Sequence, residues 1–187
     1  MNEKILALCI TVLVFCAPLK AGEISYSNFA IIYTDSDGSD GGGFGGSVEL
    51  NENVYLIGSF AHQESDLEIN GEAVAESDRI DIGIGYHTPL SESTDFVISA
   101  TYIEVESEFL GTESDDDGYS LNGGVRSMVS DTVELNGGIT HISDGDDSET
   151  GIFLGAAFNV SDSIALIVNY VNIDSDDAIG LGVRFGM

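Results

Sequence analysis

The sequence predicts an all-β protein: a transmembrane up-and-down antiparallel β-barrel preceded by a cleaved signal peptide. Three observations predict it. They are an apolar run near the N-terminus, a hairpin pattern that recurs along the chain, and 33 acidic against 5 basic residues, with the acid gathered on alternate connections. A formal charge of −28 is typical of disorder, but 43% apolar residues and only 2 prolines supply enough material to fold. The excess of acid excludes a nucleic-acid binder that tracks phosphates.

Residues 1–21 have the pattern of a secretory signal peptide. Lys4 precedes an apolar run over residues 5–17, and Ala21 is a small residue at the expected cleavage site. The run is too short for a transmembrane helix, which needs about 20 residues. The remaining domain, residues 22–187, contains neither cysteine and so needs no disulfide and no thiolate metal site. Cleavage leaves three arginines, no lysine and 32 acidic residues.

Four short polar turns mark the repeated hairpin. Each places Ser, Thr, Asn, Asp or Glu between two apolar ends, and their first residues are 40, 39 and 31 positions apart. That spacing fits two strands of about ten residues plus a loop, and a period of this size indicates a repeated supersecondary unit. The four turns are residues 50–54, 90–96, 129–133 and 160–164.

Between the turns, apolar residues alternate with polar or small ones, which is typical of strands with one apolar face. Ile80, Ile82 and Ile84 share one face, for example, while Arg79 and Asp81 share the other. The first and third expected strands are apolar on both faces, so their orientation stays open. We expect ten strands, with eight as the alternative, near residues 24–34, 42–50, 54–64, 77–88, 96–106, 118–129, 133–143, 150–160, 164–173 and 177–187.

The strand lengths suit a membrane. Strands of about ten residues tilted near 45° cross a hydrocarbon layer, and a closed barrel leaves no unpaired backbone in lipid. Short turns at one rim, longer loops at the other and an even strand number match a bacterial outer-membrane barrel, with periplasmic termini and extracellular acidic loops. The tyrosines expected to form girdles at the membrane interfaces are Tyr26, Tyr33, Tyr55, Tyr86, Tyr102, Tyr119 and Tyr170.

Across residues 22–187 the chain resembles the small bacterial outer-membrane barrels of the OmpA/OmpX-like group. The resemblance rests on the export signal, the hairpin repeat and the alternating terminal strand Ile179, Leu181, Val183 and Phe185, which looks like the signal such proteins present to the barrel assembly machinery. It implies a monomer among outer-membrane lipid and lipopolysaccharide, without a cofactor, whose assembly signal is Phe185. The alternative is a soluble secreted or periplasmic β-barrel or sandwich. Glycines on the face opposite the apolar one count against that alternative.

Charged residues on the polar face are expected to line the lumen, where they must be paired or hydrated. Arg126 and Glu134 lie on adjacent strands and are expected to meet across the turn at 129–133. Such pairing would plug the lumen; the alternative is a pore constriction of fixed charges, with an acidic rim that favours cations. The expected lumen network comprises Arg79, Asp81, Arg126, Glu134, Arg184 and Glu49.

The connections opposite the short turns carry 23 of the 33 acidic residues, in groups of 3, 6, 7, 4 and 3. Neither an EF-hand loop nor a GGxGxD repeat is completed there, so we expect at most weak, multi-loop binding of Mg²⁺ or Ca²⁺. The candidate ligands are Asp35, Asp37, Asp40, Asp115, Asp116, Asp117, Asp144, Asp146 and Asp147.

The sequence supports no enzyme. It contains no GxSxG, HExxH or CxxC motif. His62 and His141 are expected near the loop rim and His87 near the turn rim, so the three histidines should not converge. We therefore expect a non-enzymatic barrel with a structural or surface-interaction role, and a narrow cation-preferring, porin-like channel as the alternative.

Overall fold

The computed structural model describes residues 24, 26–36, 38–69, 72–144, 147–174 and 176–186. The predicted signal peptide, residues 1–21, lies outside these ranges. Ten long strands close into one antiparallel barrel, and β4 (Glu68–Ile69) and β5 (Glu72–Ala73) form a separate two-stranded hairpin beside it. No helix in the described part of the chain is long and apolar enough to cross a membrane. The predicted all-β barrel of ten strands is confirmed.

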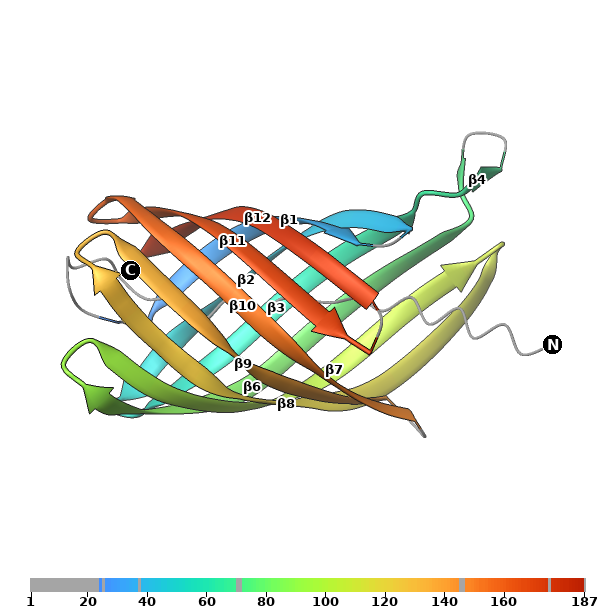
Figure 1. Ribbon diagram of the computed structural model, residues 1–187. Helices are drawn as coiled ribbons and strands as arrows, with labels where there is room; N and C mark the ends of the chain where they lie inside the picture. Colours follow the sequence, from blue (N-terminus) through green and yellow to red (C-terminus); the bar gives the residue numbers. More distant parts are fainter. Residues whose placement is uncertain are drawn as a thin grey trace.

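The barrel strands follow one another in an up-and-down order, and the first strand closes the barrel by pairing with the last (Figure 1). Around the barrel the order is β1-β12-β11-β10-β9-β8-β7-β6-β3-β2. The strands are β1 (Asn28–Ser36), β2 (Ser39–Asn51), β3 (Val54–Ser65), β6 (Ala75–Ser91), β7 (Thr94–Phe109), β8 (Thr112–Ser130), β9 (Val133–Asp144), β10 (Asp147–Ser161), β11 (Ile164–Ile173) and β12 (Asp176–Gly186).

One end of the barrel, here called the turn end, holds four two-residue connections at 52–53, 92–93, 131–132 and 162–163. A polar side chain caps each turn: Asn51 Oδ1, for example, accepts hydrogen bonds from the backbone N–H groups of Asn53 and Val54 at 3.0 and 3.1 Å. The second turn residue then accepts a backbone hydrogen bond from the next strand, as Asn53 does from His87 at 2.8 Å. The recurring polar motif therefore ties each turn to the neighbouring hairpin.

The opposite end, here called the loop end, differs from the prediction. The expected strands 96–106 and 118–129 leave residues 107–117 as a loop, but β7 and β8 continue as strands to a tight turn at Leu110 and Gly111, which have φ values of 49° and 78°. In Figure 1 this hairpin reaches well past β12. A strand that projects into water needs no apolar face, so the alternation of apolar and polar residues that reveals the other strands is missing there.

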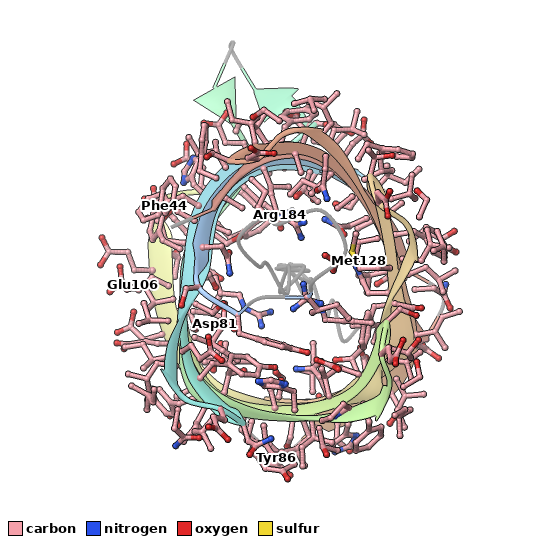
Figure 2. The ribbon with its side chains drawn as sticks, turned by 90° about the vertical axis from the view of Figure 1, so that its left-hand side faces the viewer. Phe44, Asp81, Tyr86, Glu106, Met128 and Arg184 are labelled. Carbon is pink, nitrogen blue, oxygen red and sulfur yellow. The ribbon has the colours of Figure 1, made fainter. Side chains whose placement is uncertain are left out.

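Side chains alternate between the lumen and the outer surface as predicted. Ile80, Ile82 and Ile84 are 45%, 65% and 51% exposed on the outside, while Arg79 and Asp81 are buried inside. Figure 2, which looks along the barrel, shows the same division. Arg184, Asp81 and Met128 point inward, and Phe44, Tyr86 and Glu106 point outward.

The structure settles the two strands whose orientation was open. On β1, Phe29, Ile31 and Tyr33 face outward and Ala30 faces the lumen; on β3, Leu56 faces outward. The outward residues complete an apolar belt around the barrel. Its exposed members include Phe29, Ile31, Phe44, Leu56, Ile82, Ile84, Ile98, Leu121, Ile139, Leu154, Leu166, Ile179 and Leu181.

For two of the expected girdle tyrosines the prediction was wrong. Tyr26 and Tyr55 are buried, at 1% and 0% exposure, and belong to a cluster inside the barrel. Tyr55 has the inward parity of β3, and Tyr26 precedes the first ladder pair of β1 at Asn28, so neither side chain reaches the outer surface. Tyr33, Tyr86, Tyr102 and Tyr119 are exposed on the outer face, and Tyr170 is half-buried.

Candidate functional site

The lumen near the turn end contains a buried group of three charges. Arg126 on β8 donates two hydrogen bonds to Glu134 Oε1 on β9, at 2.9 Å from Nε and 2.7 Å from Nη2. Arg184 on β12 donates from Nη2 to Glu134 Oε2 at 3.2 Å. All three side chains are at most 1% exposed. Since β12 lies three strands from β9, this carboxylate links two separated parts of the barrel wall.

A second buried pair lies on β6. Arg79 and Asp81 are two residues apart on the inward face, and the guanidinium donates to the carboxylate at 2.7 Å from Nη2 and 3.1 Å from Nε. Ser59 of β3 also donates to Asp81 Oδ2, at 3.0 Å. Both charges are therefore paired and hydrogen-bonded, as buried ions require.

Glu49, the sixth residue expected in the lumen network, does not join it. Its side chain is 39% exposed at the turn end, and its Oε1 lies 4.0 Å from Nε2 of His87. Glu49 pairs in register with the inward Tyr55, but its place next to the β2–β3 turn leaves its carboxylate partly exposed.

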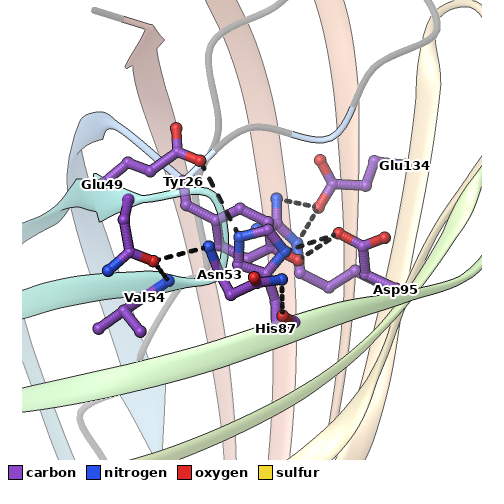
Figure 3. A network of polar contacts seen from close by, with 9 residues as sticks. Tyr26, Glu49, Asn53, Val54, His87, Asp95 and Glu134 are labelled. Atoms are coloured by element: carbon purple, nitrogen blue, oxygen red, sulfur yellow. Dashed lines mark hydrogen bonds and ion pairs between the residues drawn. The ribbon is translucent and has the colours of Figure 1, made fainter.

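An aromatic group that the sequence did not reveal lies beside these charges (Figure 3). The Tyr26 hydroxyl donates to Asp95 Oδ2 at 2.8 Å, and its ring stacks on His87 and Tyr55 at centroid distances of 3.7 and 4.8 Å. The guanidinium carbon of Arg126 lies 4.7 Å from the Tyr26 ring centroid, within cation–π range. His87 Nδ1 lies 3.2 Å from Asp95 Oδ2 without the alignment of a hydrogen bond.

Sequence reasoning had a usable signal for one of these residues. His87 has the inward parity of the expected strand 77–88, while Asp95 belongs to the expected turn 90–96 and takes inward parity because β7 begins earlier, at Thr94. Tyr26 falls within the expected strand 24–34, but the orientation of that strand was open, so the pattern did not place Tyr26 in the lumen; the observed β1 begins only at Asn28.

Beyond the apolar belt, the outer surface carries carboxylates that lie opposite one another on neighbouring strands; this surface is here called the acidic wall. It covers β3, β6, β7 and β8 at the loop end, and its members lie in cross-strand rows, Glu64–Glu76–Glu108–Glu113, Asp78–Glu106–Asp115 and Glu104–Asp117. Like charges directly opposite each other destabilise a sheet. The three arginines of residues 22–187 all lie in the lumen, so none of them offsets this repulsion.

The acidic wall contains one histidine. His62 Nδ1 lies 2.7 Å from Asp78 Oδ1, and Nε2 lies 3.2 Å from Glu64 Oε1. His62 lies beyond the last belt residue of its strand, and the hydrogen bond to Asp78 raises its pKa above the ordinary value. The other histidines lie elsewhere, His141 beside Thr150 on the outside and His87 in the lumen, and so do not converge with it.

The candidate cation ligands fall on three hairpins. Asp35 and Asp40 face each other across β1 and β2, and Asp40 accepts a hydrogen bond from Tyr33. Asp115 and Asp117 belong to the acidic wall, while Asp116 has the opposite parity on β8; Asp147 pairs with Asp144 across β9 and β10. Asp37, Asp146 and the side chain of Asp144 lie outside the described residues. Over the described ranges, no three His, Cys, Asp or Glu side chains are grouped to hold a metal ion.

The expected assembly residue lies near the end of the last strand. Phe185 faces outward at the turn end of β12 and is paired in register with Phe29 of β1 and Ile164 of β11. It is therefore on the apolar belt, next to the seam where the first and last strands close the barrel.

Comparison with solved structures supports the fold. The NanC porin is 11% identical, with a TM-score of 0.57, over 85% of this chain and all of that one. The KdgM porin is 8% identical, with a TM-score of 0.50, over 86% and 99%, and its complex with disordered oligogalacturonate matches equally well. No protein-family model and no curated protein matches the chain. The expected outer-membrane barrel fold is thus confirmed.

Proposed function

We propose that this protein is a non-enzymatic, integral barrel of the bacterial outer membrane whose lumen is closed by its own side chains and which acts through its acidic outer surface. The observation that carries the proposal is the separation of charge. Every arginine of residues 22–187 is buried in the lumen, and the carboxylates of the acidic wall face outward. A protein arranged in this way has its polar pairing inside and presents one sign of charge to its surroundings.

The apolar belt supports the membrane location. Isoleucine, leucine and phenylalanine side chains that are 38–65% exposed encircle the barrel, and soluble monomers rarely expose contiguous apolar patches of more than a few hundred Å². The direction of insertion follows from the connections, since outer-membrane barrels have short periplasmic turns and longer external loops. The termini would be periplasmic and the acidic wall extracellular, after export directed by residues 1–21.

Two measurements test this proposal. The refolded protein in detergent should migrate differently on a gel before and after boiling, because a folded membrane barrel resists unfolding by the gel detergent. In planar lipid bilayers it should insert without steady conductance. A sample with the same mobility before and after boiling would contradict the membrane barrel, and sustained openings would contradict the closed lumen.

A second candidate function is a narrow, cation-preferring channel. It is favoured by the likeness to two structures described as porins, NanC and KdgM, and by the carboxylates at the loop end. Steady openings whose reversal potential in a salt gradient shows cation preference would establish it. Silence in the bilayer, with the β-sheet circular dichroism signal retained, favours the surface-interaction role.

The partners remain part of the proposal. Lipid and lipopolysaccharide would surround the apolar belt, the barrel assembly machinery would engage the strand that contains Phe185, and Mg²⁺ or Ca²⁺ would bind weakly to the loop-end carboxylates of a monomer. Calorimetric titration with millimolar Ca²⁺ tests the cation binding, and an absence of heat would remove it. Replacing Phe185 with Ala should slow machinery-assisted assembly, while Phe29→Ala on the neighbouring strand serves as the matched control.

A further inference from the structure

The segment before β1 is attached to the barrel differently from the strands. The first ladder pairs of β1 join Asn28 to Gly186 and Ser47, so Tyr26 and Ser27 precede every ladder hydrogen bond. Local contacts hold them instead: Ser47 Oγ donates to the Tyr26 carbonyl at 2.8 Å, and the Glu49 N–H donates to Ser27 Oγ at 3.1 Å. This segment can therefore move without breaking the closed sheet.

The Tyr26 side chain nevertheless spans the lumen. Its hydroxyl reaches Asp95 on β7, and β7 is separated from β1 by three strands in one direction around the barrel and by five in the other. The ring thus connects nearly opposite parts of the wall. Figure 3 shows it in one group with His87, Asp95 and Glu134.

Tyr26 also joins the two polar groups of the turn end. The first group is His87 and Asp95: the Tyr26 ring stacks on His87, and the Tyr26 hydroxyl donates a hydrogen bond to Asp95. The second group is Arg126 and Glu134. The Tyr26 ring makes a cation–π contact with the Arg126 guanidinium, which also donates hydrogen bonds to Glu134. The other four side chains of this group come from strands, and Tyr26 alone among the five precedes the sheet.

We propose that Tyr26 is the removable part of the lumen seal, and that its withdrawal opens the turn end of the barrel to small ions. The Arg126–Glu134–Arg184 group is the fixed part, because all three residues belong to strands of the closed sheet. The inference rests on the proposed closed membrane barrel, and it assigns the closure to one residue.

Conductance in planar bilayers tests the inference, with wild-type protein, Tyr26→Ala and a matched control. The control is Tyr33→Ala, which removes an outer-face tyrosine that also hydrogen-bonds an aspartate. We expect openings with Tyr26→Ala and silence with the wild type and the control. Loss of a hydrogen bond to a charged group shifts an equilibrium by about tenfold or more, so Tyr26→Phe should raise the open fraction by that factor. Asp95→Asn, which weakens the same bond from the β7 side, should act in the same direction.

Each outcome has a separate meaning. A folded Tyr26→Ala variant that is as silent as the wild type overturns the inference and leaves the proposed closed barrel intact. Wild-type openings equal to those of Tyr26→Ala overturn the closed lumen itself. If Tyr26→Ala does not fold, Tyr26→Phe and Asp95→Asn decide, because both keep the ring in place; silence in both overturns the inference.

Discussion

Removing the carboxylate at the centre of the lumen network should destabilise the barrel strongly. Glu134 accepts hydrogen bonds from both Arg126 and Arg184, and all three side chains are buried. Glu134→Ala leaves two guanidinium groups in the lumen without this shared acceptor. Breaking a buried ion pair by deleting one partner costs about 3–5 kcal/mol. At about 1.36 kcal/mol per factor of ten, the folding equilibrium constant should fall roughly 150- to 5,000-fold.

Urea unfolding in lipid vesicles measures this change. The chain contains no tryptophan, so the transition should be followed by circular dichroism and by the fraction that keeps its unboiled gel mobility. The control is Glu106→Ala on the acidic wall, where a carboxylate is exposed and faces other carboxylates. This variant should be unchanged or slightly more stable, since like charges directly opposite each other destabilise a sheet.

A third variant separates the role of the charge from that of packing. Replacing the whole group by Arg126→Met, Glu134→Leu and Arg184→Met should be neutral or stabilising by about 1–4 kcal/mol, as for other buried ion pairs replaced by apolar residues. The reasoning is refuted if Glu134→Ala loses less than about 1 kcal/mol, or if the triple variant is the least stable of the set.

Three further predictions concern other parts of the chain. Gly85→Ala should impair folding, because a Cβ there would overlap the buried Tyr55 ring, and the refolded yield measures the loss. His62 should titrate above about 6.5, with its midpoint lowered by Asp78→Asn in an NMR titration. Since the folded pKa is raised, the histidine contributes stability below the unfolded pKa and loses it as pH rises through the folded pKa. The mass of the exported protein should lack residues 1–21.

Each of these predictions has a control or a contrary result. Gly58→Ala is the matched glycine substitution, since a Cβ there meets its nearest atom at 4.0 Å, and equal yields for the two variants would count against the overlap. A midpoint for His62 at or below 6.5 would show that the carboxylates do not stabilise its charged form. A full-length mass in the membrane fraction would contradict cleavage.

The fold could be predicted because membrane strands have a simple rule. Lipid outside and side-chain packing inside force alternation, so the inward parity of Arg79 and the outward parity of Ile80 follow directly from their positions. The contact between Arg126 and Glu134 was predictable for a similar reason, since the two residues flank one short turn on the same face.

The rest depended on features that alternation does not encode. The link from Glu134 to Arg184 depends on the curvature of the closed barrel, which brings strands far apart in order within reach of one another. Beyond the belt, water accepts polar residues on both faces, so the extension of β7 and β8 as strands left no pattern to detect. Tyr26 lies in the expected strand 24–34, but that strand is apolar on both faces, so its orientation could not be predicted; in the structure Tyr26 precedes β1, which begins at Asn28.

Because every arginine of residues 22–187 is buried inside the barrel, the acidic wall also affects how two copies of the protein would interact. A surface with a single sign of charge has nothing to pair with on an identical surface. Two copies brought edge to edge at their acidic walls would set carboxylates against carboxylates, and this repulsion acts over about 8 Å at physiological ionic strength. If the barrel lies in a membrane as proposed, we expect the spacing between copies that approach through their acidic walls to depend on salt.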